Sequence, residues 1–164
     1  MNHVCYISIG SNLGNRILNI KNSIFELSSF TLISRISSYY ETSPWGYEDT
    51  HQYINVVVKI KTNLYPHDLL KKLKKIEKKM GRLLWNDGIY RSRIIDLDIL
   101  FFDDLILNEL DLIIPHPKLY NRKFVLIPLF EIVPNFICPF TKKKIKEILK
   151  ELKDNTIISR YDLK

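Results

Sequence analysis

Two aspartates, Asp96 and Asp98, alternate with apolar residues in a stretch typical of a β-strand. If residues 94–102 form a strand, both carboxylates share one face, about 6.6 Å apart along the backbone. Two carboxylates at this spacing can hold hard cations such as Mg²⁺ through oxygen ligands. Arg91 and Arg93 precede them, and guanidinium groups bind phosphate oxygens. Together these residues predict a site for a metal-bound polyphosphate, although D-x-D alone also fits the solvated face of an edge strand.

Length and composition limit the architecture that positions these residues. The chain has 164 residues and is 46% hydrophobic, enough for one buried core, so we expect residues 1–164 to form a single domain. No run approaches the roughly 20 apolar residues of a membrane span, and the N-terminus lacks a signal-peptide pattern. Cys5 and Cys138 lack the spacing of a zinc site or a disulfide scaffold. The sequence therefore predicts a cytoplasmic protein with two reduced thiols and no membrane partner.

The order of the expected elements favours an α+β fold of the ferredoxin-like type. Apolar alternation predicts strands over 3–9, 32–41, 52–61 and 94–102, and helical spacing predicts helices over 17–27 and 66–81. The order βαββαβ is that of an antiparallel sheet with both helices on one face. We expect short C-terminal elements to follow, namely a turn and helix within 115–134 and a basic helix over 142–153.

Alternation also predicts which side chains face a ligand. In the strand over 94–102, Asp96 and Asp98 should point away from Ile95, Leu97, Ile99 and Phe101. In the strand over 52–61, Tyr53 and Asn55 should point away from the aliphatic residues that pack under the helices. The two pairs should therefore meet on the sheet face that the helices leave open.

Glu77 falls in the apolar stripe of the second predicted helix, where a lone ionised carboxylate is costly to bury. Two interpretations stay open. Glu77 is either a structural brace for an arginine such as Arg82, Arg91 or Arg93, or a residue at the edge of the stripe that reaches water.

His116 lies between two prolines, close in sequence to Arg122 and Phe124. A lone histidine is usually structural, but a neutral imidazole here can also donate a hydrogen bond to a phosphate oxygen. Trp45, Tyr53, Tyr90 and Phe124 fit an ordinary aromatic core. Flat rings beside the Asn55 amide also suit a planar heterocycle rich in donors and acceptors.

Taken together, the chain resembles the 6-hydroxymethyl-7,8-dihydropterin pyrophosphokinase family over residues 6–134, with 135–164 as a C-terminal extension of the same domain. The motifs that carry the resemblance are Gly10-Ser11-Asn12-Leu13-Gly14, Tyr40-Glu41-Thr42 with Pro44, Tyr53-Ile54-Asn55, Glu77 through Gly81-Arg82, Arg93-Ile94-Ile95-Asp96-Leu97-Asp98-Ile99-Leu100, and Pro115-His116-Pro117 with Arg122, Phe124, Pro128-Leu129 and Glu131. The family has the ferredoxin-like fold, and its members transfer pyrophosphate from ATP to a pterin hydroxymethyl group, leaving AMP.

The resemblance implies roles for individual residues. Asp96 and Asp98 would bind two Mg²⁺ ions that bridge the triphosphate, with Arg82 and Arg93 acting on the phosphates. The other implied nucleotide contacts are Leu70 and Ile99 near the base, and His116 and Arg122 at phosphate oxygens. The implied pterin contacts are Thr42, Pro44, Trp45, Tyr53, Asn55, Tyr90 and Phe124.

The chain departs from the family pattern on the phosphate side. Where the family usually has the motif Arg-Trp-Gly-Pro-Arg, this chain has Tyr90-Arg91-Ser92-Arg93. At two further positions where the family commonly has arginine, this chain has Leu84 and Asp111. ATP binding or transfer should therefore be weaker unless Arg91 or Lys74 compensates.

The net charge of +7 favours anionic partners without choosing among them. Much of the excess lies in lysine-rich segments at 71–79 and 142–150, most simply the solvated faces of two helices. A single-stranded RNA-binding module of the same fold is the competing class, but two aspartates on its ligand face would repel phosphate in the absence of metal. A catalytically weakened relative is a second alternative. We expect small-molecule substrates, no nucleic acid and a monomer.

Overall fold

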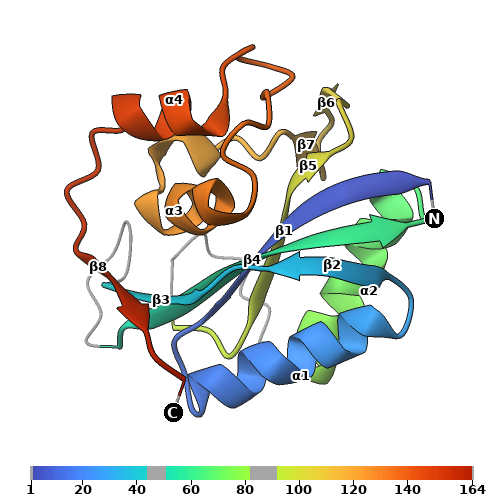
Figure 1. Ribbon diagram of the computed structural model, residues 1–164. Coiled ribbons are helices and arrows are strands. Elements are labelled where there is room, and N and C mark those ends of the chain that lie inside the picture. The colour runs from blue at the N-terminus through green and yellow to red at the C-terminus, as the bar shows by residue number, and fades with distance from the viewer. Residues whose placement is uncertain (1, 44–50, 82–91, 164) are drawn as a thin grey trace.

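The computed structural model describes residues 2–43, 51–81 and 92–163, and it is built around one antiparallel sheet. The strands of the sheet are β1 (His3–Ser11), β2 (Leu32–Ile36), β3 (Tyr39–Thr42), β4 (Tyr53–Thr62), β5 (Asp96–Phe102) and β8 (Ile158–Tyr161). They run in the order β5-β1-β4-β3-β8, and β2 pairs with β4 beside β3 (Figure 1). A separate hairpin joins β6 (Leu107–Asn108) and β7 (Ile113–Ile114). This confirms the predicted ferredoxin-like βαββαβ core.

Helices lie on both sides of the sheet. The first layer contains α1 (Arg16–Ser28) and α2 (Pro66–Lys79), as the ferredoxin-like pattern predicts. The other face carries the 3₁₀ turn η1 (Leu119–Asn121), α3 (Lys123–Ile132) and α4 (Ile145–Glu151) (Figure 1). The C-terminal helices therefore cover part of the face that was expected to be open. Within the described residues, a pocket lies at the remaining end of this face.

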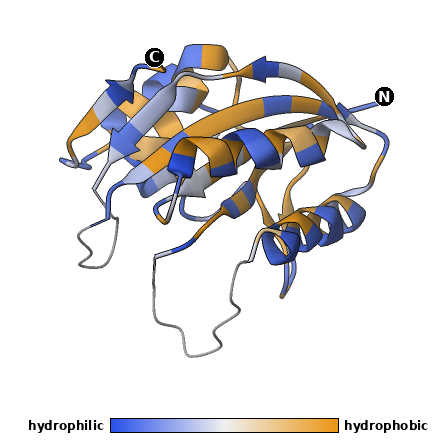
Figure 2. Cartoon of the chain, turned by 90° about the horizontal axis from the view of Figure 1, so that it is seen from below, coloured by the Kyte–Doolittle hydropathy of each residue, from blue (hydrophilic) through white to orange (hydrophobic). Residues whose placement is uncertain are grey.

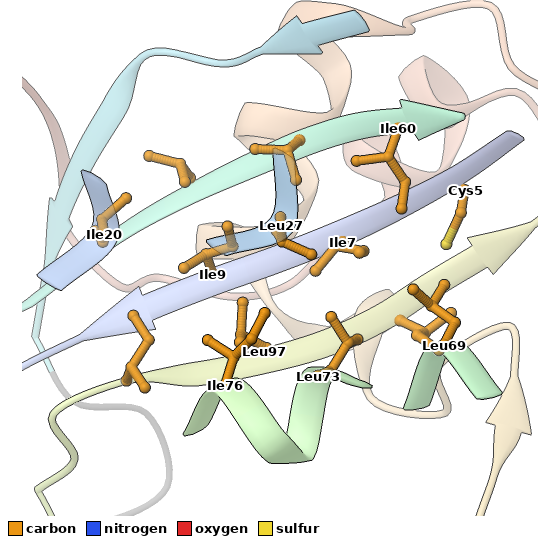
Figure 3. Packing of buried hydrophobic residues seen from close by; sticks show 14 of the residues in the cluster. Cys5, Ile7, Ile9, Ile20, Leu27, Ile60, Leu69, Leu73, Ile76 and Leu97 are labelled. Carbon is orange, nitrogen blue, oxygen red and sulfur yellow. The ribbon is translucent and has the colours of Figure 1, made fainter. Parts of the chain in front are cut away.

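The two layers enclose separate apolar clusters. In the first, side chains of α1 and α2 pack on the odd-numbered residues of β1 and on β5, as Figure 3 shows for Ile7, Ile9, Ile20, Leu27, Leu69, Leu73, Ile76 and Leu97. In the second, Val125, Leu126 and Leu129 of α3 pack on Tyr6 and Phe101. Figure 2 shows hydrophobic residues concentrated along the central strands and alternating with hydrophilic ones along the helices. Burying each of these large side chains contributes about 1.5–3 kcal/mol.

A β-bulge in β5 changes the predicted alternation. Tyr6 pairs with Phe101 but Ile7 pairs with Ile99, so Leu100 is an extra residue in β5. As a result Leu100 and Phe101 both lie in the α3 cluster, whereas Ile99 and Phe102 lie in the α1 and α2 cluster. The prediction that Phe101 shares a face with Ile99 is therefore wrong. Asp96 and Asp98 precede the bulge and keep their predicted face.

The strand predicted over 32–41 is two strands separated at Ser37 and Ser38. Glu131 of α3 stabilises this break, since its Oε1 accepts hydrogen bonds of 2.9 Å from both the backbone N–H and the hydroxyl of Ser38. Its Oε2 accepts a 2.6 Å bond from the Tyr40 hydroxyl. Glu131, one of the residues that carry the family resemblance, thus fixes α3 against β3.

The C-terminal segment differs from the prediction in two ways. The basic helix is shorter than 142–153, because Glu147 accepts a hydrogen bond from the Lys144 backbone N–H and the helix begins only at Ile145. A strand, β8, then adds to the edge of β3. Among the described residues, no helix is long and apolar enough to cross a membrane.

Candidate active site

A pocket opens on the α3 side of the sheet where β1, β4 and β5 run together. Its lining residues are Ser8, Gly10, Thr42, Ser43, Tyr53, Asn55, Arg93, Asp96, Asp98, Arg122 and Phe124. Eight of these are candidate site residues from the sequence. Ser8, Gly10 and Ser43 were missed, although the alternation of Tyr6, Ser8 and Gly10 with Ile7 and Ile9 could have revealed the first two.

The carboxylates of Asp96 and Asp98 enter the pocket from β5, opposite Gly10 and Ser8 of β1. Arg93 donates a 3.0 Å hydrogen bond from its guanidinium to Asp96 Oδ2. Burial, together with the negative charge of Asp96, raises the pKa of Asp98 to about 7. Two carboxylates that repel each other across one surface, and that offer hard oxygen ligands, fit a divalent cation.

His116 lies beside Asp98, with 3.9 Å between His116 Nε2 and Asp98 Oδ2. The backbone N–H of Lys118 donates to His116 Nδ1 at 3.1 Å, which leaves the proton of the neutral ring on Nε2. Burial and the charge of Arg122 lower the pKa of His116 to about 4. At neutral pH the imidazole is therefore an uncharged donor next to the carboxylates.

Arg122 brings a second guanidinium to the pocket from the residue that precedes α3. Its side chain is largely buried, at 9% exposure, and its Cζ lies 5.5 Å from the centroid of the Phe124 ring. An arginine held over an aromatic face keeps its charge while losing mobility. The pocket thus has a cationic side formed by Arg93 and Arg122.

The opposite side of the pocket is polar but uncharged. Asn55 is 3% exposed and donates from Nδ2 to Thr42 Oγ1 at 3.3 Å. Gly10 pairs with Asn55 across β1 and β4, and a Cβ at Gly10 would lie 2.6 Å from Asn55 Oδ1. Only glycine leaves this amide in place. The Tyr53 ring, next to it, provides a flat surface for a planar ligand.

Glu77 is buried at the free edge of β5 and supports the strand between the two aspartates. Its Oε1 accepts a 2.8 Å hydrogen bond from the Leu97 backbone N–H, and its Oε2 lies 3.1 Å from Lys74 Nζ. The bracing interpretation therefore fits better than an edge residue reaching water, but the contacts described are with β5 and Lys74. Arg82 and Arg91 lie outside the described residues.

Some of the other predicted residues lie away from the pocket lining, and the rest fall outside the described residues. Leu70 and Ile99 pack against the α1 and α2 cluster, so the Ile99 side chain points away from the aspartates. Asp111 lies in the β6–β7 turn, its Oδ1 3.8 Å from His67 Nε2. Pro44, Trp45, Arg82, Leu84, Tyr90 and Arg91 fall outside the described residues.

Comparison with known proteins identifies the family of this chain. Residues 6–134 match the family described as 7,8-dihydro-6-hydroxymethylpterin-pyrophosphokinase (HPPK). The chain belongs to the HPPK family. It is accordingly a diphosphotransferase of folate biosynthesis.

Relatives of two lengths match this HPPK chain. The 2-amino-4-hydroxy-6-hydroxymethyldihydropteridine pyrophosphokinase of Aquifex aeolicus is 42% identical over 149 residues, covering 89% of this chain and 90% of the relative. The Bacillus subtilis enzyme of the same name is 41% identical over 134 residues, covering 80% and 79%. The folic acid synthesis protein FOL1 of Dictyostelium discoideum is 44% identical over 139 residues, covering 84% of this chain but 21% of the relative. This HPPK chain thus spans about a fifth of the length of FOL1.

Solved structures share the fold at low sequence identity. The wild-type HPPK-DHPS of Plasmodium falciparum with pteroate superposes with a TM-score of 0.73 at 17% identity, over 91% of this chain and 42% of that one. This likeness supports the ferredoxin-like architecture described above.

Proposed function

We propose that this HPPK chain transfers pyrophosphate from ATP to the hydroxymethyl group of 6-hydroxymethyl-7,8-dihydropterin, giving AMP and the pterin diphosphate. The observation that carries the proposal is the division of one pocket into two sides. Asp96, Asp98, Arg93 and Arg122 form a charged side suited to a metal-bound triphosphate, while Asn55 and the rings of Tyr53 and Phe124 suit a planar heterocycle.

In this proposal Asp96 and Asp98 would hold two Mg²⁺ ions, which would supply positive charge to the triphosphate. Arg93 and Arg122 bind phosphate oxygens, and the neutral His116 donates from Nε2 to another. Arg82 is assigned to the phosphates by the resemblance. Lys74 or Arg91 takes the place of the arginines absent at Leu84 and Asp111, and Lys74 is already directed towards β5 by Glu77.

The pterin side would hold the ring edge at Asn55, whose amide orientation is fixed by Thr42. Pro44, Trp45 and Tyr90 complete the pterin assignment. The resemblance assigns Leu70 and Ile99 to the nucleotide base, although the Ile99 side chain is buried in the α1 and α2 cluster. The hydroxymethyl oxygen then attacks the β-phosphorus, and its O–P bond forms as the bond from the β-phosphorus to the AMP oxygen breaks. The hydroxyl proton leaves to Asp98 or, if metal polarisation of the hydroxyl replaces a general base, to solvent. Holding both substrates in line contributes about 7–11 kcal/mol.

A product assay tests this function. With ATP, Mg²⁺ and 6-hydroxymethyl-7,8-dihydropterin, we expect stoichiometric AMP and pterin diphosphate, because attack at the β-phosphorus releases AMP. Phosphorus NMR distinguishes these products from ADP and a pterin monophosphate. ADP accumulation, or no nucleotide turnover by folded protein with reduced pterin, would contradict the proposal.

Metal affinity should depend on pH. Without metal, Asp98 is protonated below its raised pKa of about 7, so a cation must displace a proton there. We expect the affinity for Mn²⁺, used as a spectroscopic probe, to fall as the pH is lowered from 8 to 6. Asp98→Asn should bind Mn²⁺ more weakly and lose most of this dependence. An affinity independent of pH in the wild type would show that Asp98 is not a ligand.

Three further predictions accompany the assignment. Residues 135–164 extend the same domain, since Ile145 and Ile148 of α4 share an apolar cluster with α3. A monomeric state and a cytoplasmic location stay predictions, to be tested by light scattering and by cell fractionation. The RNA-binding alternative is not favoured, because Asp96 and Asp98 line the pocket and would repel phosphate in the absence of metal.

A further inference from the structure

Asn12, in the turn that follows β1, is buried at 1% exposure although its side chain is polar. Its hydrogen bonds reach the segment that enters β5. The backbone N–H of Asn12 donates to the Arg93 carbonyl at 3.1 Å, and its Oδ1 accepts from the Arg93 backbone N–H at 2.5 Å. Its Nδ2 donates to Ser92 Oγ at 3.1 Å. The side chain and the backbone of Asn12 thus together hold Ser92 and Arg93.

These bonds lie beyond the end of the β1–β5 ladder, whose last pair is Gly10 with Asp96. Ile95, on the N-terminal side of Asp96, is fully buried in the apolar cluster and has no partner residue in β1 within this ladder. In a longer ladder a backbone carbonyl would accept the hydrogen bond from the Arg93 N–H, and here the amide oxygen of Asn12 accepts it instead. It therefore fixes the backbone of Arg93 independently of the β5 pairing.

The position of the Arg93 backbone controls where its guanidinium lies. Arg93 reaches Asp96 at 3.0 Å from only three residues away, and residues 82–91 precede it in the chain. We propose that Asn12 is a positioning residue. It holds Arg93 at the charged side of the pocket, in the orientation that stabilises charge on the transferred phosphates. This inference rests on the proposed function, because it assigns Asn12 an effect on transfer and not on pterin binding.

A matched pair of substitutions separates positioning from general stability. Asn15 belongs to the same turn, is exposed, and accepts a 3.0 Å bond from the Leu18 backbone N–H as the cap of α1. Asn12→Ala should lower kcat by roughly 10- to 100-fold and leave KM for the pterin close to the wild-type value. Asn15→Ala should lower the melting temperature and leave kcat unchanged. Equal effects of the two substitutions on kcat would overturn the proposal.

A double-mutant cycle tests whether Asn12 acts through Arg93. In an Arg93→Ala background, Asn12→Ala should produce little further loss of kcat. If Asn12→Ala lowers kcat as much in this background as in the wild type, Asn12 does not act through Arg93.

Hydrogen exchange gives a readout that needs no turnover. Asn12→Ala should speed exchange of the Arg93 amide in the free protein, whereas Asn12→Asp, which keeps the acceptor oxygen, should retain most of the protection. Slow exchange at Arg93 in Asn12→Ala would overturn the inference. Absence of AMP formation by the wild type would instead refute the proposed function, and the exchange result would still decide whether Asn12 holds Arg93.

Discussion

Alanine at either Asp96 or Asp98 should lower the rate of pyrophosphate transfer by roughly 10³-fold or more, because each substitution removes an oxygen ligand from the proposed metal site. The fold should survive. Both carboxylates line a pocket, and burial together with the like charge of Asp96 raises the pKa of Asp98, so the metal-free variants should melt no lower than the wild type. Single-turnover kinetics and thermal unfolding check the two halves of this expectation.

Asp104→Ala is a suitable control for these variants. Asp104 is an exposed carboxylate just beyond β5 and does not line the pocket. The Asp104→Ala variant should transfer pyrophosphate at the wild-type rate. If Asp96→Ala or Asp98→Ala turns over at a near wild-type rate in Mg²⁺, these aspartates are not metal ligands and only form the solvated face of an edge strand.

Gly10→Ala should selectively impair use of the pterin. The added Cβ would lie 2.6 Å from Asn55 Oδ1, so the Asn55 amide must turn away from its bond to Thr42 and from the edge of the heterocycle. Losing one buried hydrogen-bond partner costs about 1–3 kcal/mol, so KM for the pterin should rise roughly 10- to 100-fold. Binding of an ATP analogue, measured by calorimetry, should change little.

The contact between Gly10 and Asn55 also predicts non-additivity. In Asn55→Ala the atom that the new Cβ would meet is gone, so adding Gly10→Ala should cause little further loss of pterin affinity. Fully additive losses, or an equal loss of ATP-analogue affinity in Gly10→Ala, would show that the glycine is needed for the sheet and not for the amide.

The parts of the fold set by local periodicity were predictable. The ferredoxin-like core and the meeting of Tyr53, Asn55, Asp96 and Asp98 on one face follow from alternation along β4 and β5, because a strand places every second residue on the same side. The residue roles assigned through the family resemblance remain predictions.

What the sequence could not supply depends on contacts between distant residues. The bulge at Leu100 arises where β5 must match both β1 and α3, and nothing in residues 94–102 alone signals it. The break near Ser38 depends on Glu131, which is 93 residues away. Asn12 was recognised only as part of a glycine-rich motif, since its partners Ser92 and Arg93 lie some 80 positions further along the chain.

The bulge in β5 constrains how chain length can vary in related proteins. The Leu100 carbonyl accepts a 3.0 Å hydrogen bond from the His116 backbone N–H, so the additional residue anchors the histidine next to Asp98. Deleting Leu100 would leave both aspartates on their own side of the strand but would remove this anchor. Deleting Leu97 instead would turn one carboxylate into the apolar interior. We therefore expect insertions and deletions among homologues to be excluded between Asp96 and Leu100 and to collect in the β6–β7 hairpin.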